Sequence, residues 1–218
     1  MHREARWRPA LAIVVAVILY ELLPPKLTFG PFWIVPVLVG VILVPLLVAG
    51  DRLSPKWHRV GAVTLTAILN AFNLVSVILL VSTLVDQHNP RHGSLAAFQL
   101  LQYGGLIWIT NVICFALWYW EIDDGGVEIR EGVAYQNAPA DFLFPQLTLL
   151  QSNSSCVPRN WRPMFLDYLY LSFTNALAFS PTDVMPLSRI AKMLMLIESL
   201  ISFVTVALIL ARSVNILS

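Results

Sequence analysis

Long apolar runs separated by short polar segments are the main pattern of this 218-residue chain. Five runs carry almost no charge in their interiors: Pro9 to Leu23, Phe32 to Ala49, Val60 to Val85, Phe98 to Trp120 and Ser188 to Arg212. About 20 helical residues cross the hydrocarbon core of a bilayer, so each run is long enough, or nearly so, to span it. Backbone polar groups in lipid must be satisfied within the segment, which favours helices. The pattern predicts an all-α, polytopic membrane protein with about five transmembrane helices.

Composition supports a membrane protein. Hydrophobic residues make up 57% of the chain and charged residues 12%, with a mean hydropathy of +0.71. Soluble domains carry about 25% charged residues. The net charge of +1 provides no basic surface for nucleic acid, so the lipid bilayer is the expected partner and nucleic acid is not.

The first apolar run follows a basic start, as the hydrophobic part of a signal peptide does. No cleavage site of small residues follows it, and the chain continues as Glu21-Leu-Leu-Pro-Pro-Lys26. We expect a retained first transmembrane helix. The chain then divides into N-terminal transmembrane helices, residues 1–97, and a C-terminal hairpin, residues 98–218, that contains a polar loop at residues 121–163.

The polar loop opens with an acidic cluster, formed by Glu121, Asp123, Asp124, Glu128 and Glu131. The cluster lacks the regular ligand spacing of a calcium loop, so a solvated helix end is favoured over a calcium or magnesium site, and no metal is expected. The aromatic residues just before it, Trp118 to Trp120, are typical of a membrane interface and indicate where the fourth helix ends.

A shorter apolar segment precedes the last run. Asp167 to Phe179 has about 13 residues, too few to span a bilayer. Non-helical backbone beside such a segment is tolerated at membrane depth where protein or a water-filled cavity covers it. We therefore expect a re-entrant half-helix.

The order outer helix, polar loop, short helix, turn and inner helix resembles the pore module of potassium channels. A gapless comparison with their pore-helix and filter pattern gives matches at Tyr170, Ser172, Phe173, Thr174, Asp183 and Pro186. The resemblance implies a homotetramer around one axis and monovalent cations as partners. The whole chain also resembles an uncharacterised family of bacterial inner-membrane proteins with a Gly-Gly, an Asp-Phe-x-Phe-Pro and a Tyr-x-Ser-Phe segment in this order. That likeness implies a multi-pass protein of the inner membrane and brings no activity with it.

The filter positions differ from the potassium-channel pattern Thr-Val-Gly-Tyr-Gly. They hold Ala178, Phe179, Ser180, Pro181 and Thr182, followed by Asp183. A filter glycine adopts backbone angles that a side chain disfavours by about 1 kcal/mol or more, so a potassium-selective carbonyl cage is not expected. Pro181 predicts a rigid, extended turn. Asp183 either caps a helix or lines a narrow ion pathway.

The last run carries one acidic residue, Glu198, about ten residues from its start. Ser202 and Thr205 follow at steps of three to four residues and share its helix face. Two interpretations are open: these side chains line a water-filled path, or they form hydrogen bonds to other helices.

Further polar residues of note are three asparagines and Cys114 in the apolar runs, and Cys156 in the polar loop. Asn70, Asn73 and Asn111 predict hydrogen bonds between helices. Cys114 and Cys156 show neither metal-ligand nor redox spacing. No catalytic triad, phosphate-binding loop or zinc motif occurs, so neither an enzyme nor a cofactor is expected.

The distribution of basic residues predicts the orientation. With five crossings, nine Lys and Arg residues of the loops and N-terminus lie on the side of the N-terminus and three on the other side. The positive-inside rule then places the N-terminus in the cytoplasm. The same orientation places the re-entrant segment on the cytoplasmic side, whereas the pore helix of potassium channels enters from outside.

Two functional hypotheses follow. The first is a membrane protein with an ion-channel-like pore module that lacks the glycine filter and is either a non-selective cation channel or a non-conducting relative. The alternative is a structural or interaction protein without transport activity.

Overall fold

The computed structural model describes residues 7–49, 54–85, 97–126, 140–152, 155–178 and 183–217. These residues are mostly helical, as the apolar pattern predicts. In chain order the elements are α1 (Trp7–Glu21), α2 (Ile34–Ala49), α3 (Pro55–Val85), α4 (Ala97–Ile122), the 3-10 helix η2 (Asp123–Gly125), β1 (Phe142–Leu143), α6 (Pro145–Gln151), α7 (Phe165–Ala178), β2 (Met185–Pro186) and α8 (Arg189–Leu217).

Three helical stretches of the described chain are long and apolar enough to cross a membrane. They are Lys56–Thr83, Phe98–Gly125 and Arg189–Ala211. The helices α1 and α2 have 15 and 16 residues, which gives each a length of roughly 22–24 Å, shorter than the ~30 Å of hydrocarbon. The structure thus confirms that the protein is helical and has three candidate membrane spans. The two further crossings, by α1 and α2, stay a prediction.

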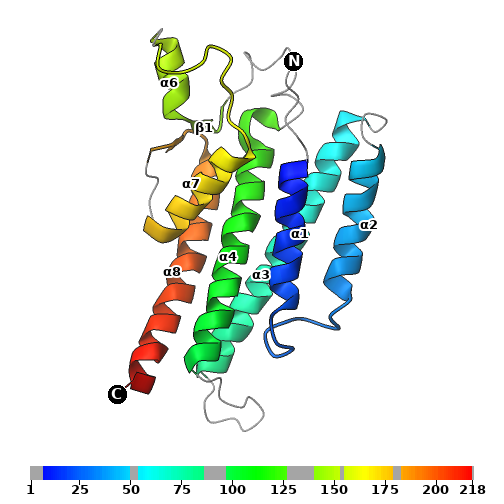
Figure 1. Cartoon of the computed structure of the whole chain (residues 1–218), viewed down its shortest axis with the longest axis vertical. Coiled ribbons are helices and arrows are strands. Elements are labelled where there is room, and N and C mark those ends of the chain that lie inside the picture. Colours follow the sequence, from blue (N-terminus) through cyan, green and yellow to red (C-terminus); the bar gives the residue numbers. More distant parts are fainter. Residues whose placement is uncertain are drawn as a thin grey trace.

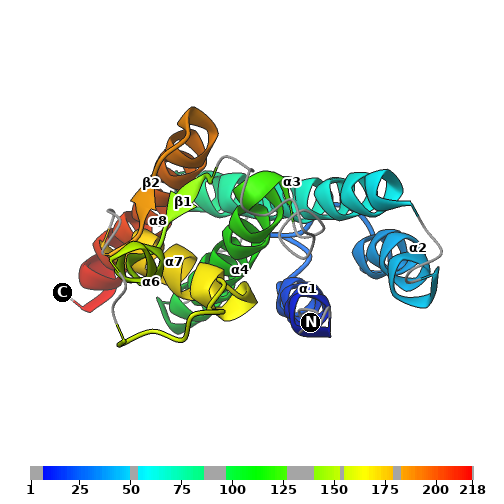
Figure 2. The same cartoon turned by 90° about the horizontal axis from the view of Figure 1, so that it is seen from above.

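Helix α4 is the central element of the bundle. It packs against α1 and α3 and also against α7 and α8, while α2 packs mainly on α3 at the periphery. Figure 2 shows α4 between these two groups of helices. Figure 1 shows that α1 and α3 begin, and α4 ends, at the same end of the bundle, where β1 and α6 also lie. We call this the upper end, and the C-terminus lies at the opposite end.

Helix α7 and the start of α8 form a hairpin at the upper end. Helix α7 starts there and packs against α8, and β2, which precedes α8, pairs with β1 in an antiparallel ladder of Phe142 with Pro186 and Leu143 with Met185. This small ladder was not predicted from the sequence. It fixes the point from which α8 begins.

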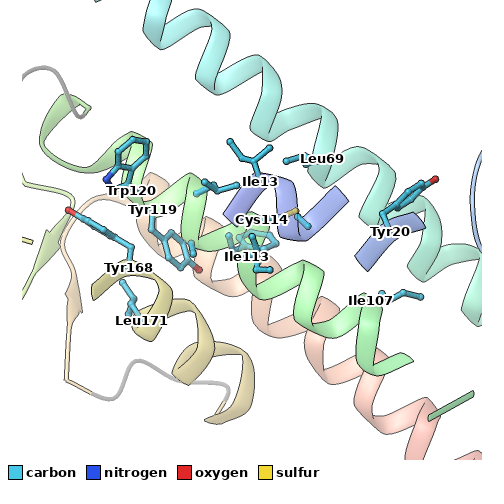
Figure 3. Close-up of a cluster of buried hydrophobic side chains, with 14 of the residues drawn as sticks. Ile13, Tyr20, Leu69, Ile107, Ile113, Cys114, Tyr119, Trp120, Tyr168 and Leu171 are labelled. Carbon is cyan, nitrogen blue, oxygen red and sulfur yellow. The ribbon is translucent and has the colours of Figure 1, made fainter. Parts of the chain in front are cut away.

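The core lies along α4. Buried apolar residues of α1, α3 and α7 surround it, including Ile13, Leu69 and Leu171, as Figure 3 shows. Near its lower end, Gly104 allows close packing, because a Cβ atom there would lie 2.2 Å from Ile209 Cδ1 of α8. Small residues at such contacts allow membrane helices to approach closely.

The structure corrects two sequence interpretations at the end of α4. Glu121, Asp123 and Asp124 are all buried, so the prediction of a solvated helix end is wrong for them; Glu128 and Glu131 lie outside the described residues. Tyr119 and Trp120 are also buried within the bundle, which contradicts a lipid-facing aromatic belt at these two positions. At Tyr119, Trp120 and Asp123 the cause is the same, because β1 and α7 contact these residues at the end of α4.

Candidate functional site

The site with the most unusual chemistry surrounds Glu198 of α8. Its side chain has 0% exposure, within one of the three candidate membrane spans. Carboxyl Oε2 accepts hydrogen bonds from the Tyr119 hydroxyl at 2.5 Å and from Asn175 Nδ2 at 2.6 Å. Oε1 lies in hydrogen-bond contact with the Ser172 hydroxyl. We call these four residues the Glu198 cluster.

Three helices supply the cluster. Ser172 and Asn175 are three residues apart on α7 and therefore share one face of it, which points to α8. Asn175 also donates to Met195 O at 3.0 Å, and the Ser172 hydroxyl lies 2.7 Å from Val112 O of α4. These bonds fix α7 against both long helices, so the carboxyl group has a defined position.

Burial of the Glu198 carboxyl group costs free energy unless nearby groups stabilise its charge. No Lys, Arg or His of the described residues hydrogen bonds or forms an ion pair with Glu198, whose recorded partners are the three polar side chains named above. An ionised carboxylate in a low-dielectric interior is strongly destabilised when it lacks a counter-charge. A lone acid inside a membrane helix is therefore a candidate functional residue.

A second polar row lies one turn further along α8. Asn73 of α3 donates to Asn111 Oδ1 of α4 at 3.2 Å, and Asn111 Nδ2 donates to Ser202 Oγ at 3.2 Å. The predicted interhelical amides are thus confirmed for Asn73 and Asn111, whereas Asn70 bonds to Thr66 O of its own helix. One turn after Asn73, the hydroxyl of Ser76 is buried without a hydrogen-bond partner among the described residues.

The predicted inner-helix polar residues are brought together, and they point into the bundle. Ser202 and Thr205 are both buried. The Thr205 hydroxyl donates to Ile201 O of its own helix at 2.8 Å. Glu198 and Ser202 form hydrogen bonds to other helices, as one of the two interpretations predicts, and the water-filled path stays a prediction.

The predicted filter-equivalent segment is only partly described. Ala178 at the end of α7 and Asp183 before β2 are both exposed; Phe179, Ser180, Pro181 and Thr182 lie outside the described residues, so the rigid turn stays a prediction. The side-chain cap recorded at the start of α8 is Ser188, whose Oγ accepts from Ala191 N at 3.1 Å.

A second buried acid, Asp123, organises the upper end of the bundle. Its Oδ1 accepts from the backbone N–H groups of Asp141 and Phe142 at 2.9 and 3.0 Å, and its Oδ2 accepts from the Tyr168 hydroxyl at 2.6 Å. The backbone turns sharply here, because Asp124 has a φ of 53° and is followed by two glycines of positive φ. Asp123 thereby attaches β1 and α7 to the end of α4.

Sequence reasoning missed three members of the Glu198 cluster. The sequence pattern places Tyr119 at the membrane interface and Ser172 among the matches to a pore helix, and it indicates no role for Asn175. Tyr119 is 79 positions away from Glu198 in the chain, so sequence spacing gave no indication of the contact. The three-residue step between Ser172 and Asn175, on a helix too short to span, was the available clue.

Comparisons with known proteins add no assignment. No family model, no curated protein and no solved structure matches this chain.

Proposed function

We propose that this chain is a multi-pass protein of the bacterial inner membrane that carries a monovalent cation through its own helix bundle, with Glu198 as the binding residue. One observation carries the proposal: Glu198 has 0% exposure in a candidate membrane span and has polar partners on two other helices. Ionisable residues inside membrane spans are costly, face the bundle interior and mark ion or proton pathways.

An arrangement with five membrane-crossing helices agrees with the apolar outward face of α8 and with the positions of the basic residues. The outward face of α8 is apolar, with exposed Ile190, Met193, Leu196, Leu200 and Phe203. Basic residues of the described chain gather at the upper end, where α1 and α3 begin and α7 starts; they include Arg8, Lys56, Arg59 and Arg162. The positive-inside rule then makes the upper end cytoplasmic, and the α7–α8 hairpin enters from that side.

This proposal modifies the pore-module hypothesis. In a tetrameric channel the inner-helix polar residues line the central axis. Here Glu198, Ser202 and Thr205 are buried within one chain, against α4 and α7. A path inside each subunit fits this arrangement better than a central pore, and a homotetramer is not required for it.

The second candidate is a structural membrane protein without transport. It is favoured by the complete hydrogen bonding of Glu198, because a fully satisfied buried polar group also stabilises a unique helix packing. The two candidates differ in whether cations cross the membrane.

Reconstitution into liposomes tests the proposal. Purified protein should increase the flux of a monovalent cation, measured separately for H⁺, Na⁺ and K⁺ with ion-sensitive dyes, and Glu198→Gln should abolish it. Glu21→Gln is the matched control, because it also neutralises an acid on an apolar helix but lies outside the Glu198 cluster. Equal flux in wild type and Glu198→Gln would contradict the proposal. Absence of flux of all three ions in folded wild type would favour the structural candidate.

A further inference from the structure

The hydrogen bonds of the Glu198 cluster depend on whether its carboxyl group carries a proton. The Ser172 hydroxyl has one proton but contacts two oxygens, Val112 O at 2.7 Å and Glu198 Oε1. A carbonyl oxygen only accepts. If Glu198 were ionised, Ser172 could donate its proton in only one of these two contacts. In the other contact, two oxygen atoms would face each other with no proton between them.

A protonated Glu198 removes this conflict. With its proton on Oε1, Glu198 donates to Ser172 Oγ, and Ser172 donates to Val112 O. Tyr119 and Asn175 donate to Oε2, and the second Asn175 Nδ2 proton goes to Met195 O. Every contact then contains one proton, and no uncompensated charge is buried.

We infer that Glu198 is a neutral carboxylic acid in this state and that the cation it exchanges is a proton; the second part depends on the proposed function. On release, the Oε1–H bond breaks, its electron pair stays on Oε1 and the proton passes to water. The Ser172 hydroxyl then turns from Val112 O to Oε1, so that the carboxylate has three donors. Ser172 is thus a positioning residue: it accepts a hydrogen bond from the protonated acid and donates one to the carboxylate.

The surroundings of the carboxyl group favour a proton over a metal cation. Sodium and potassium need several oxygen atoms that present lone pairs to them. The recorded partners of Oε2, Tyr119 and Asn175, present donor hydrogens to it instead. Tyr119 is the titratable group that faces Glu198 from α4; α7 contributes Ser172 and Asn175, which do not titrate, and Asn73 of α3 reaches the second polar row through Asn111.

Infrared spectroscopy of the full chain in lipid vesicles tests the protonation state directly. At neutral pH the wild type should show an absorption band of a protonated carboxylic acid that shifts in D₂O. Glu198→Gln should lose this band, and Glu21→Gln should keep it. If Glu198→Gln does not fold, Ser172→Ala provides a second test, because the loss of the partner of Oε1 should shift the band while leaving the acid present.

The outcomes separate the two claims. A band that is absent from the wild type, or identical in wild type, Glu198→Gln and Ser172→Ala, overturns the protonated state. The band together with no flux of H⁺, Na⁺ or K⁺ supports the protonated acid and contradicts transport. Sodium or potassium flux that needs Glu198, without the band, supports transport and overturns the proton as its ion.

Discussion

Replacing Asp123 with alanine should destabilise the protein by about 2–6 kcal/mol, because it leaves buried donors without an acceptor. The carboxylate accepts from the N–H groups of Asp141 and Phe142 and from the Tyr168 hydroxyl. The N–H of Asp141 is partly buried and can bond to water. The other two donors are buried, and each costs about 1–3 kcal/mol when left unsatisfied, which gives the estimate.

Two milder variants test the cause. Tyr168→Phe removes one hydrogen bond to a charged group and should cost about 1.5–3 kcal/mol. Asp123→Asn keeps an acceptor for the two backbone N–H groups and should cost less than alanine. In the double variant Asp123→Ala with Tyr168→Phe, the unsatisfied hydroxyl is absent, so the combined loss should be smaller than the sum of the single losses.

The chain contains its own probe of unfolding. Cys114 is buried and Cys156 is exposed. In a Cys156→Ser background, a thiol-reactive dye reports the exposure of Cys114 during thermal or denaturant unfolding in detergent. Additive losses in the double variant, or an unchanged unfolding midpoint for Asp123→Ala, would refute the role of Asp123 in holding β1 and α7.

Three further predictions follow from the same structure. Gly104→Ala should cost about 1–3 kcal/mol because its Cβ meets Ile209, whereas Gly105→Ala, with no neighbour within 4 Å, should be neutral or stabilise by up to about 1 kcal/mol; equal unfolding midpoints would contradict the close packing. Asn111→Ala should cost about 1 kcal/mol, since it removes two interhelical bonds of about 0.6 kcal/mol each; an unchanged midpoint would show that these bonds do not stabilise the bundle. In whole cells, a membrane-impermeant thiol reagent should label a cysteine at position 90 and fail to label one at position 2, and labelling at position 2 would reverse the orientation.

The apolar runs predicted the long helices well, because a long apolar helix can be recognised from its own segment of the sequence. Helices α3, α4 and α8 coincide closely with three of the predicted runs, since a continuous apolar segment must satisfy its backbone within itself. The short helix α7 was also predicted, from a segment too apolar for water and too short to span. Helical structure in this chain follows directly from hydrophobicity and length.

The site was predicted only in part because it depends on contacts between distant segments. Glu198 is recognisable in the sequence as an isolated charge in an apolar run. Its partner Tyr119 is adjacent to two tryptophans, and composition favours an interfacial role for such a group. The acids after Tyr119 look solvated in the sequence for a similar reason. Asp123 is buried because β1 and α7 pack over it and bond to its carboxylate, a contact that no local pattern encodes.

Helix α7 connects the two buried acids and therefore couples them mechanically. Near its start, Tyr168 donates to Asp123, and one and two turns later Ser172 and Asn175 contact Glu198. Movement of α7 away from α8 would remove two of the three partners of Glu198 at once and would also strain the bond to Asp123. Water can reach Glu198 only if this packing opens, since the side chain has no exposed surface in the closed arrangement. Access of an ion to Glu198 from the upper end would thus require displacement of α7, and the bonds to Asp123 would set part of the free energy that opposes it.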